Sequence, residues 1–301
     1  MHLLSIADMT GDGIRALLDR AEEIKAETRA GVFNPLLKDK TLGLIFHKPS
    51  LRTRVSFEVG MGQLGGRSIY ITDQEVGMGA RESIEDVARV LSRYVDGMMI
   101  RTYSHQIAVD LAKAASVPVI NGLTDLLHPC QILSDLLTIQ EKRGDLDLLK
   151  VVYIGDGNNV ANSWLNAASV LPMKLTLVTV KGQEPDRKTA ANAKAFPGSV
   201  VDVVYDPAKA VRDTDVIYTD VWTSMGQEKE RKRRQKLMAG LQVNGALLKK
   251  APEDVIVMHC LPAHRGEEIT DEVIDGPNSV VLDQAENRMH LQKAILAELM
   301  A

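Results

Sequence analysis

The sequence predicts an α/β fold of two lobes, each a mostly parallel sheet flanked by helices. Three observations lead to this prediction. The 301 residues exceed the usual length of a single domain. Short apolar runs alternate with longer helical patterns, as parallel strands joined by helical crossovers require. The alternation restarts after Arg143-Gly144-Asp145, so we place the boundary between the lobes near these residues.

The first lobe begins with an amphipathic helix, because apolar residues between positions 14 and 24 recur at helical spacing. Apolar runs then predict four strands with helices between them. These strands are expected at residues 41–46, 68–72, 97–100 and 117–120. A long helical stretch over residues 131–142 completes the lobe. We therefore assign residues 1–142 to the first domain.

The second lobe repeats this architecture. Strands are expected at residues 150–154, 174–180, 200–205, 216–219 and 255–258, with a last short one at 280–282. The charged run 228–234 has mixed signs and is interpreted as a solvated helix face. We assign residues 143–285 to the second domain, and residues 286–301 to a helix that packs back on the first lobe.

Composition excludes several classes of partner. The net charge of -4 provides no overall field for a polyanion, so nucleic acid is not expected. No apolar run approaches the roughly 18 residues that span a bilayer, and the N-terminus lacks a secretory signal. Neither membrane binding nor export is expected. Cys130 and Cys260 are interpreted as free thiols of a cytoplasmic protein.

The segment Ser50-Leu51-Arg52-Thr53-Arg54 follows one predicted strand and opens the next helix. N–H groups at a helix start lack partners within the helix, and the helix dipole there favours negative charge. Arginine can hold phosphate oxygens with two parallel hydrogen bonds. The segment predicts a phosphate site, and the alternative is an ordinary serine cap beside surface arginines.

Two further motifs lie in the first lobe. Arg101 follows a predicted strand at its carboxyl end, which faces the ligand crevice in parallel sheets. It either binds a ligand or pairs with a buried acid. His128-Pro129-Cys130-Gln131 begins the long helix. A histidine and a glutamine there can polarise a carbonyl and accept from an amide NH₂, although a structural role for the histidine stays open.

The second lobe begins with a glycine turn, Gly155-Asp156-Gly157-Asn158-Asn159, between a strand and a helix. It looks like the start of a dinucleotide fingerprint, but Val160 stands where the third glycine is required. The nucleotide interpretation is therefore weak. The asparagines could instead reach a substrate at the strand end.

Three more motifs follow strand ends in this lobe. Asp220 begins the first, which runs to Ser224-Met225-Gly226, and Arg288 lies beyond the last predicted strand. The segment 259–266 holds His259, Cys260 and His264. We considered zinc there, but no second cysteine cluster exists in the sequence, so we expect no metal.

Together and in this order, the motifs resemble the aspartate and ornithine carbamoyltransferase family over almost the whole chain. The ornithine branch fits best, because Asp220 with residues 224–226 looks like its ornithine loop and 259–262 like its cysteine-bearing loop. The aspartate branch would carry leucine in place of Cys260. The resemblance implies transfer of the carbamoyl group of carbamoyl phosphate to the side-chain amine of L-ornithine, which gives L-citrulline and phosphate in arginine biosynthesis. It implies no cofactor and no metal.

The resemblance also implies a role for each motif residue. The expected carbamoyl phosphate-binding residues are Ser50, Leu51, Arg52, Thr53, Arg101, His128, Pro129, Cys130, Gln131, Cys260, Leu261 and Arg288. The expected catalytic residues among them are Arg101, His128, Gln131 and Cys260. The expected ornithine-binding residues are Asn159, Asp220, Ser224 and Met225. Cys260 would contact the substrate and would not act as a nucleophile.

One loop departs from the family pattern. Ornithine members often carry glutamine-leucine-glycine-arginine-glycine near residues 75–82, where this chain has Gly77-Met78-Gly79-Ala80-Arg81. The loop resembles one that reaches into a neighbouring subunit, so a homotrimer or higher homo-oligomer is implied. Three alternatives stay open: a sister transferase that uses putrescine, N-acetylornithine or aspartate, a nucleotide-dependent oxidoreductase, and a homologue that only binds ligands.

Overall fold

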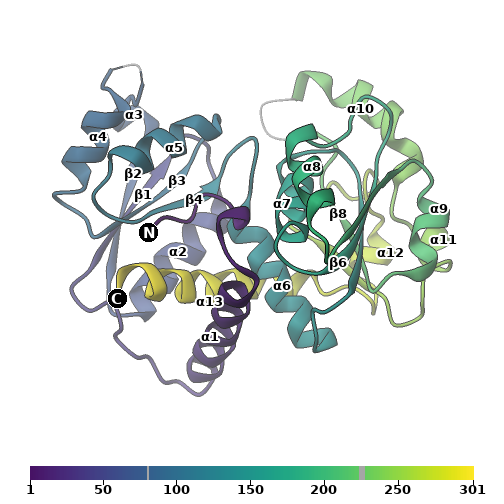
Figure 1. Cartoon of the computed structure of the whole chain (residues 1–301), viewed down its shortest axis with the longest axis horizontal. Helices are drawn as coiled ribbons and strands as arrows, with labels where there is room; N and C mark the ends of the chain where they lie inside the picture. The colour runs from purple at the N-terminus through teal and green to yellow at the C-terminus, as the bar shows by residue number, and fades with distance from the viewer. Residues whose placement is uncertain (80, 224–227) are drawn as a thin grey trace. The chain divides into compact units, whose positions relative to one another are not determined.

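The computed structural model describes residues 1–79, 81–223 and 228–301 and divides the chain into two compact units. The first unit comprises Met1–Leu137 with Glu286–Ala301, and the second comprises Thr138–Ala285. Figure 1 shows that each unit is a sheet flanked by helices. The helices α6 (Pro129–Arg143) and α13 (Val281–Met300) contribute residues to both units. The predicted α/β class with two sheets is confirmed.

The first unit is built on a parallel sheet with the strand order β2-β1-β3-β4. Its strands are β1 (Thr41–Phe46), β2 (Arg67–Thr72), β3 (Gly97–Arg101) and β4 (Val119–Leu123). The winding direction reverses between β1 and β3, which pair with Phe46 opposite Arg101. Open α/β sheets bind ligands at the carboxyl ends of the strands beside such a switch point.

The helices of the first unit cover both faces of this sheet. They are η1 (Ile6–Asp8), α1 (Gly11–Arg29), α2 (Leu51–Gln63), α3 (Asp73–Val76), α4 (Ile84–Leu91) and α5 (His105–Ala114), with parts of α6 and α13. α4 and α5 pack on one face against buried Ile45, Met98 and Ile100. α13 also contacts the sheet, since a Cβ added at Gly97 would lie 2.8 Å from Met300 Sδ.

The C-terminal helix returns to the first unit, as predicted. Lys25 Nζ in α1 donates to Asn287 Oδ1 in α13 over 2.6 Å. Lys293 Nζ donates to Thr28 Oγ1 over 2.5 Å and to Gln63 Oε1 over 2.9 Å. These buried polar contacts join α13 to both α1 and α2 and fix its position on the first unit.

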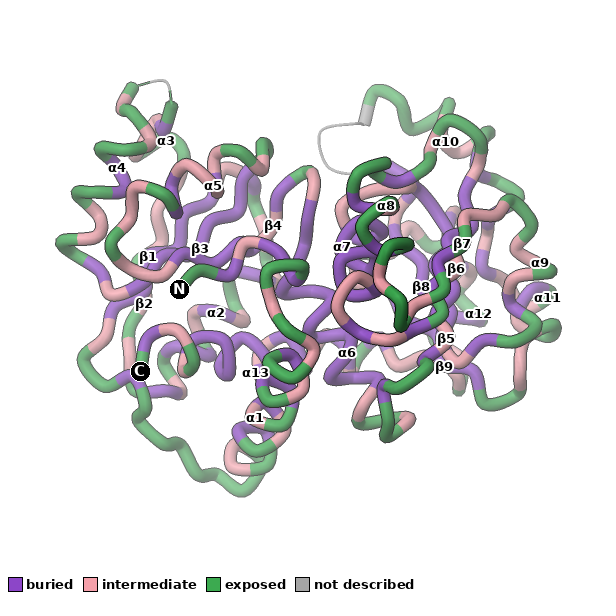
Figure 2. The backbone as a smooth tube through the Cα atoms, in the orientation of Figure 1, coloured by how far each residue is buried: buried purple, intermediate pink, exposed green. Residues whose placement is uncertain are grey.

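The second unit is built on a parallel sheet with the order β7-β6-β5-β8-β9. Its strands are β5 (Leu149–Ile154), β6 (Met173–Val178), β7 (Val200–Val204), β8 (Val216–Thr219) and β9 (Ile256–His259). The switch point lies between β5 and β8, and the carboxyl end of β9 is next to that of β8. Figure 2 shows that the central strands are largely buried.

Helices cover both faces of the second sheet too. They are α7 (Asn159–Ala168), α8 (Arg187–Ala195), α9 (Pro207–Ala210), η2 (Val211–Asp213), η3 (Glu228–Glu230), α10 (Arg231–Met238), η4 (Ala239–Leu241), α11 (Gly245–Leu248) and α12 (Asp271–Ile274). On one face Trp164 of α7 meets the Tyr218 ring edge-on at 5.7 Å. On the other, Met238, Leu247 and Val273 join a core cluster with the strands.

The structure corrects one predicted element. The expected strand at residues 280–282 is wrong, because α13 already begins at Val281 and Gln284 N donates to Val280 O over 2.9 Å. Val280 N donates to Val257 O, and Val257 N donates to Asn278 O, so this segment meets the sheet in an isolated bridge before the helix starts. A short apolar run fits a buried strand and a buried helix start equally well.

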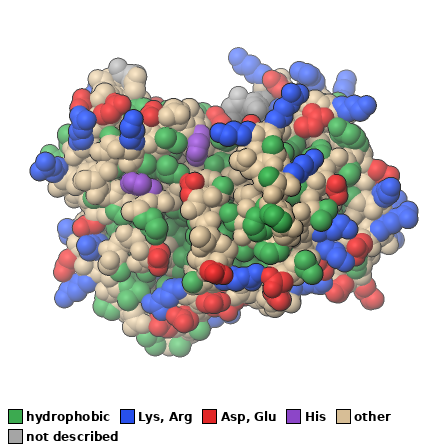
Figure 3. All heavy atoms as spheres, in the orientation of Figure 1, with side chains coloured by type: hydrophobic (Ala, Val, Ile, Leu, Met, Phe, Trp, Pro, Cys, Tyr) green, Lys and Arg blue, Asp and Glu red, His purple; other side chains and the backbone are tan. Residues whose placement is uncertain are grey.

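Helix hydropathy and surface charge are two further features of the described residues. Among the described residues, no helix combines the length and apolar character needed to cross a bilayer. On the described part of the face in Figure 3, basic and acidic side chains are interspersed. Proteins that bind polyanions usually present a surface of one sign.

Candidate active site

The predicted phosphate segment is the start of α2 at the carboxyl end of β1. Ser50 caps the helix, because its Oγ accepts from Thr53 N over 3.3 Å. Leu51 is exposed and Arg52 is partly exposed, so the first turn is open on its outer side. Arg54 points elsewhere: its Nε donates to Glu58 Oε1 over 3.0 Å. Arg54 is therefore a surface arginine, as in the alternative interpretation of this segment.

Buried side chains beside this turn form one hydrogen-bonded cluster. Thr53 Oγ1 accepts from Arg101 Nη1 over 3.2 Å and from Arg288 Nη2 over 2.8 Å. Arg288 Nη1 donates to Gln131 Oε1 over 2.8 Å, and Gln131 Nε2 donates to Asp135 Oδ1 over 2.9 Å. The structure thus brings together four residues that the sequence predicted, from α2, β3, α6 and α13. We call them, with Asp135, the Thr53 cluster.

Positive charge is concentrated in the Thr53 cluster. Two guanidinium groups converge on one uncharged hydroxyl, and Arg101 and Arg288 are only 7% and 3% exposed. Burial, and then the charges of Arg288 and Arg101, hold the pKa of His128 well below its ordinary value of 6.5. His128 is therefore neutral at about pH 7. An anion bound here would be attracted by both arginines.

Pro129 and Cys130 are the first residues of α6. Cys130 is fully buried, and its Sγ donates to Asn121 O over 3.4 Å. Burial raises the pKa of its thiol to about 12. The Cys130 side chain is therefore a protonated packing group, and a ligand contact at this position would use the backbone.

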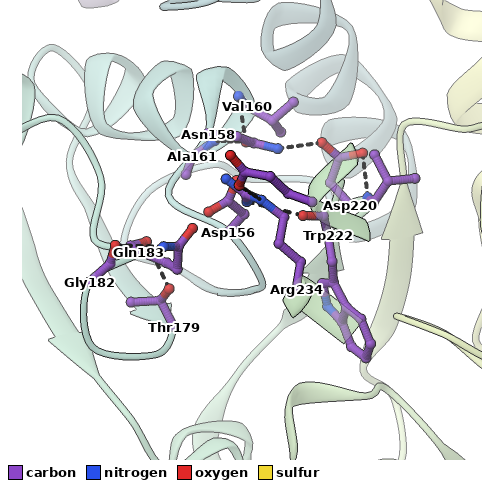
Figure 4. Close-up of polar contacts among 12 residues, drawn as sticks. Asp156, Asn158, Val160, Ala161, Thr179, Gly182, Gln183, Asp220, Trp222 and Arg234 are labelled. Atoms are coloured by element: carbon purple, nitrogen blue, oxygen red, sulfur yellow. Dashed lines mark hydrogen bonds and ion pairs between the residues drawn. The ribbon is translucent and has the colours of Figure 1, made fainter. Parts of the chain in front are cut away.

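The second unit gathers polar groups at its own switch point, between the ends of β5, β8 and β9. Asp220 Oδ2 accepts from Asn158 Nδ2 over 2.7 Å, and its Oδ1 accepts from Val221 N over 2.8 Å and from Cys260 Sγ over 3.0 Å. Asn158 caps α7, because its Oδ1 accepts from Val160 N over 2.9 Å. Figure 4 shows Asn158 pointing at Asp220. The predicted Asp220 and Cys260 are thus brought together.

A buried ion pair lies beside Asp220. Arg234 Nη1 donates to Asp156 Oδ2 over 2.8 Å and to Trp222 O over 3.2 Å (Figure 4). Burial raises the pKa of Asp156 even though Arg234 opposes that shift. Arg234 belongs to the charged run that was expected to be a solvated face. That expectation is wrong for this residue, whose side chain is 11% exposed.

The glycine turn after β5 is filled by the protein itself. Gly157 N donates to Gln183 O over 2.9 Å, and a Cβ added at Gly157 would lie 2.3 Å from Pro185 N. In a dinucleotide site the backbone of this turn approaches the pyrophosphate. Here the segment with Gln183 and Pro185 takes that place, and this contact argues against the nucleotide alternative.

The loop after β9 carries Cys260 and Leu261. His259 is 1% exposed, its Nδ1 accepts from Leu261 N over 2.9 Å, and its Nε2 lies 3.1 Å from Glu268 Oε1. Because Nδ1 accepts, the neutral ring carries its proton on Nε2 and donates it to Glu268. Leu261 has a φ of 57°, and its N–H makes the bond to His259 Nδ1.

The remaining predictions concern Asn159, Ser224, Met225 and the loop at residues 75–82. Asn159 is the first residue of α7 and is partly exposed. Ser224 and Met225 lie outside the described residues, as does Ala80 in the 75–82 loop. Two contributing residues were not predicted, namely Asp135 and Glu268, and Asn158 was named only as one of two neighbouring asparagines that could reach a substrate. The sequence contains a pattern that could have indicated Asp135, because this residue lies four positions after Gln131 on the same face of a helix.

Comparison with known families gives two matches that cover nearly the whole chain. Residues 1–141 match the model described as the aspartate/ornithine carbamoyltransferase carbamoyl-P binding domain. Residues 147–299 match the Asp/Orn binding domain of the same family.

Individual proteins give the same result. The chain is 54% identical to an ornithine carbamoyltransferase of Syntrophus aciditrophicus over 98% of this chain and 97% of that protein. It is 53% identical to the anabolic ornithine carbamoyltransferase of Pyrococcus furiosus over 99% of this chain and 96% of that protein. A solved Pyrococcus furiosus structure of this enzyme superposes with a TM-score of 0.95, at 52% identity over 99% and 96% of the two chains. One from Thermus thermophilus gives 0.90, at 42% identity over 100% and 99%. The chain therefore belongs to the aspartate/ornithine carbamoyltransferase family.

Proposed function

We propose that this chain transfers the carbamoyl group of carbamoyl phosphate to the side-chain amine of L-ornithine and so produces L-citrulline and phosphate. The observation that carries the proposal is the Thr53 cluster, in which two arginines converge on one hydroxyl. Four of its five residues, Thr53, Arg101, Gln131 and Asp135, lie in the stretch that matches a carbamoyl-P binding domain. Relatives more than half identical over nearly the full length carry the name ornithine carbamoyltransferase.

The phosphate group would bind at the start of α2. The N–H groups of Leu51 and Arg52 belong to the first turn of this helix, and Thr53 N is held by the Ser50 cap. Helix starts of this kind favour anions through their N–H groups and dipole. Arg101 and Arg288 add two guanidinium groups. Attraction between these cations and a doubly charged phosphate offsets their mutual repulsion.

The carbamoyl group would lie against Arg101, His128 and Gln131. Because His128 is neutral, its imidazole can donate to the carbonyl oxygen without repelling the two arginines. Arg101 and Thr53 aim further donors at the same oxygen as it gains charge. Gln131 Oε1 already accepts from Arg288, and its second lone pair can accept from the carbamoyl NH₂. We also propose that Pro129, Cys130, Cys260 and Leu261 contact carbamoyl phosphate, as the family resemblance implies.

L-Ornithine would bind to the second unit at Asp220. A carboxylate that already accepts from Asn158, Val221 and Cys260 is held in one orientation. It can pair with the α-ammonium group at the amino-acid end of ornithine. Asn159, Ser224 and Met225 complete the proposed ornithine-binding set. Asn158 is a positioning residue, because it acts on the substrate through Asp220.

The chemistry requires a neutral amine as the nucleophile. A lysine-like amine has a pKa of about 10.4, so its deprotonation at pH 7 costs about 4.6 kcal/mol. Nearby arginines and exclusion of water both disfavour the ammonium form and lower this cost. The amine attacks the carbamoyl carbon, the bond from that carbon to the phosphate oxygen breaks, and the departing phosphate can take the proton. No covalent enzyme intermediate is needed.

We further propose that residues 1–142 bind carbamoyl phosphate, residues 143–285 bind ornithine, and residues 286–301 complete the first domain. The family resemblance supports a homotrimer or higher homo-oligomer. The free thiols of Cys130 and Cys260 support a cytoplasmic location. The word anabolic in the name of the Pyrococcus furiosus relative supports a role in arginine biosynthesis.

A panel of amine acceptors tests the reaction. Purified protein is incubated with carbamoyl phosphate and L-ornithine, putrescine, N-acetylornithine or L-aspartate, and each carbamoylated product is quantified by mass spectrometry. We expect L-citrulline with equimolar phosphate as the main product. Carbamoylation of another amine without L-citrulline would assign the chain to a sister transferase. Binding of carbamoyl phosphate without any product would identify a ligand-binding homologue.

A further inference from the structure

We propose that His264, Glu267 and Glu268 form a binding site for a divalent transition-metal ion of the zinc class. The three residues lie in the loop between β9 and α12 of the second unit. None of them belongs to the residues that the proposed function uses, so the site stands independently of that function.

The donor atoms of these residues converge. Each residue offers one ligand atom, and these three atoms lie within 4.8 Å of one another. An imidazole nitrogen and two carboxylate oxygens are a set that zinc accepts, with a fourth position left for water. Ligands about 2.1 Å from a tetrahedral ion are about 3.4 Å apart, so small side-chain rotations would close the set.

A buried carboxylate oxygen in the cluster lacks a partner. Glu268 is 0% exposed, and its Oε1 accepts from His264 N over 2.6 Å and lies 3.1 Å from His259 Nε2. Its Oε2 is buried without a hydrogen-bond partner among the described residues, as are Glu267 Oε2 and His264 Nδ1. Buried polar atoms are nearly always satisfied, and imidazole nitrogens and carboxylate oxygens are the types of atom that bind zinc.

The charges around the cluster favour a cation. Arg231 forms an ion pair with Glu267 Oε1, which leaves one of the two carboxylates without a cationic partner. His259 is a neutral donor to Glu268, because its Nδ1 accepts from Leu261 N. The remaining negative charge favours a cation among the three donor atoms.

The spacing of the donor atoms fits one bound ion. His264 Nδ1 lies 3.8 Å from Glu267 Oε2. This separation is too long for a direct hydrogen bond between the two atoms. It is close to the separation of two ligands on one ion. An ion bound here would take one donor atom from each of the three residues.

A bound ion would stabilise a loop that carries proposed substrate contacts. Glu268 already holds the backbone of His264 and the ring of His259, and Cys260 and Leu261 directly follow that histidine. Metal binding would hold residues 264–268 of the loop together, and the existing contact of Glu268 with His259 would link them to the segment with Cys260. The expected effect is on the stability of the loop and not on the chemical step.

The test must exclude a second possible cluster. Asp220, His259 and Cys260 also place three potential ligand atoms within 4.8 Å of one another, and these residues belong to the proposed substrate sites. The Cys260→Ser background removes the thiol of that cluster. In this background, chelator-treated protein is titrated with Zn²⁺ by calorimetry, alone and with His264→Gln, Glu267→Gln or, as a control, Glu253→Gln. Glu253 is an exposed carboxylate of the same unit.

We expect one Zn²⁺ per chain in the Cys260→Ser protein. His264→Gln and Glu267→Gln should each weaken binding by at least about tenfold, because each removes a ligand. Glu253→Gln should leave it unchanged. Folded variants that keep the affinity of the background protein would overturn the proposal. Co²⁺ absorption of the Cys260→Ser protein provides a second test that needs no substitution in the site. Bands of a nitrogen- and oxygen-bound ion are expected, and their absence would also overturn the proposal.

Discussion

The two units use the same topology to build sites of opposite charge. In both, polar side chains lie at the carboxyl ends of strands beside the switch point of a parallel sheet. In the first unit these are Arg101 and, from α13, Arg288, which converge on a neutral threonine. In the second they are Asp156, which pairs with Arg234, and Asp220, which accepts from neutral donors on Asn158 and Cys260.

This difference indicates how the two substrates are separated. A site with excess positive charge favours a phosphate, and a fixed carboxylate favours an ammonium group. The sheet supplies the same framework in both units, and in the proposed function the residues at the strand ends decide which ligand binds. Substitutions at these ends should therefore affect one substrate more than the other.

The largest effect is expected for Arg101→Ala, which removes a buried guanidinium from the Thr53 cluster. We expect kcat/KM for carbamoyl phosphate to fall by about a thousandfold or more, equivalent to about 4 kcal/mol, since a charged donor to both the phosphate and the carbonyl is lost. Steady-state kinetics at saturating L-ornithine measure this value.

Arg54→Ala is the matched control, since Arg54 lies in the same helix turn but pairs with Glu58 and stacks on Tyr70. We expect it to change kcat/KM by less than about threefold, as for a surface ion pair. Equal losses in both variants would contradict the role of the Thr53 cluster.

Asp220→Asn should have the second largest effect and should act on the other substrate. Loss of the carboxylate charge is expected to raise KM for L-ornithine by about a hundredfold, or about 3 kcal/mol, because a charge-assisted hydrogen bond is lost. The Kd of carbamoyl phosphate, measured by calorimetry, should stay within about twofold. A comparable loss of carbamoyl phosphate binding would show that the two units do not divide the substrates in this way.

The sequence predicted most of this framework, because burial and periodicity are local signals. The strands at residues 41–46 and 216–219 have the predicted limits, and the others differ by a few residues at their ends. The apolar run at 280–282 failed as a strand, because Val281 and Leu282 continue into a helix whose partners lie elsewhere in the chain. Such a choice depends on tertiary contacts that three residues do not encode.

For the site, residue types at strand ends were informative but pairings were not. The sequence placed Arg101 and Asp220 at carboxyl ends, where the structure finds them. It did not reveal that Arg234, in a run of mixed charges, would pair with Asp156 at a distance of 78 residues. Nor did it distinguish Asn158, which contacts Asp220, from its neighbour Asn159. Both outcomes depend on three-dimensional packing.

The comparison extends to Lys293, a buried cation of the first unit that lies away from the Thr53 cluster. It is 1% exposed, and burial lowers its pKa from 10.5 to about 8. Between these two values the unfolded chain binds more protons than the folded one, so the free energy of unfolding should rise with pH. Lys293→Met should remove about 2 kcal/mol of this rise. Denaturant unfolding of both proteins from about pH 7.5 to about pH 10 measures it. A constant difference between them would contradict the lowered pKa.

The smallest effect is expected at the two neighbouring asparagines of the second unit. Asn158 is proposed to position Asp220, and Asn159 is proposed to bind L-ornithine directly. Asn158 caps α7 and donates to Asp220, so Asn158→Ala should lower the free energy of unfolding by about 1 kcal/mol and raise KM for L-ornithine by about tenfold. Asn159→Ala leaves the cap in place and should raise KM for L-ornithine without this loss of stability. Unfolding curves and kinetics on both variants distinguish the two roles. If Asn159→Ala destabilised the protein more than Asn158→Ala, the assignment of the helix cap to Asn158 would be wrong.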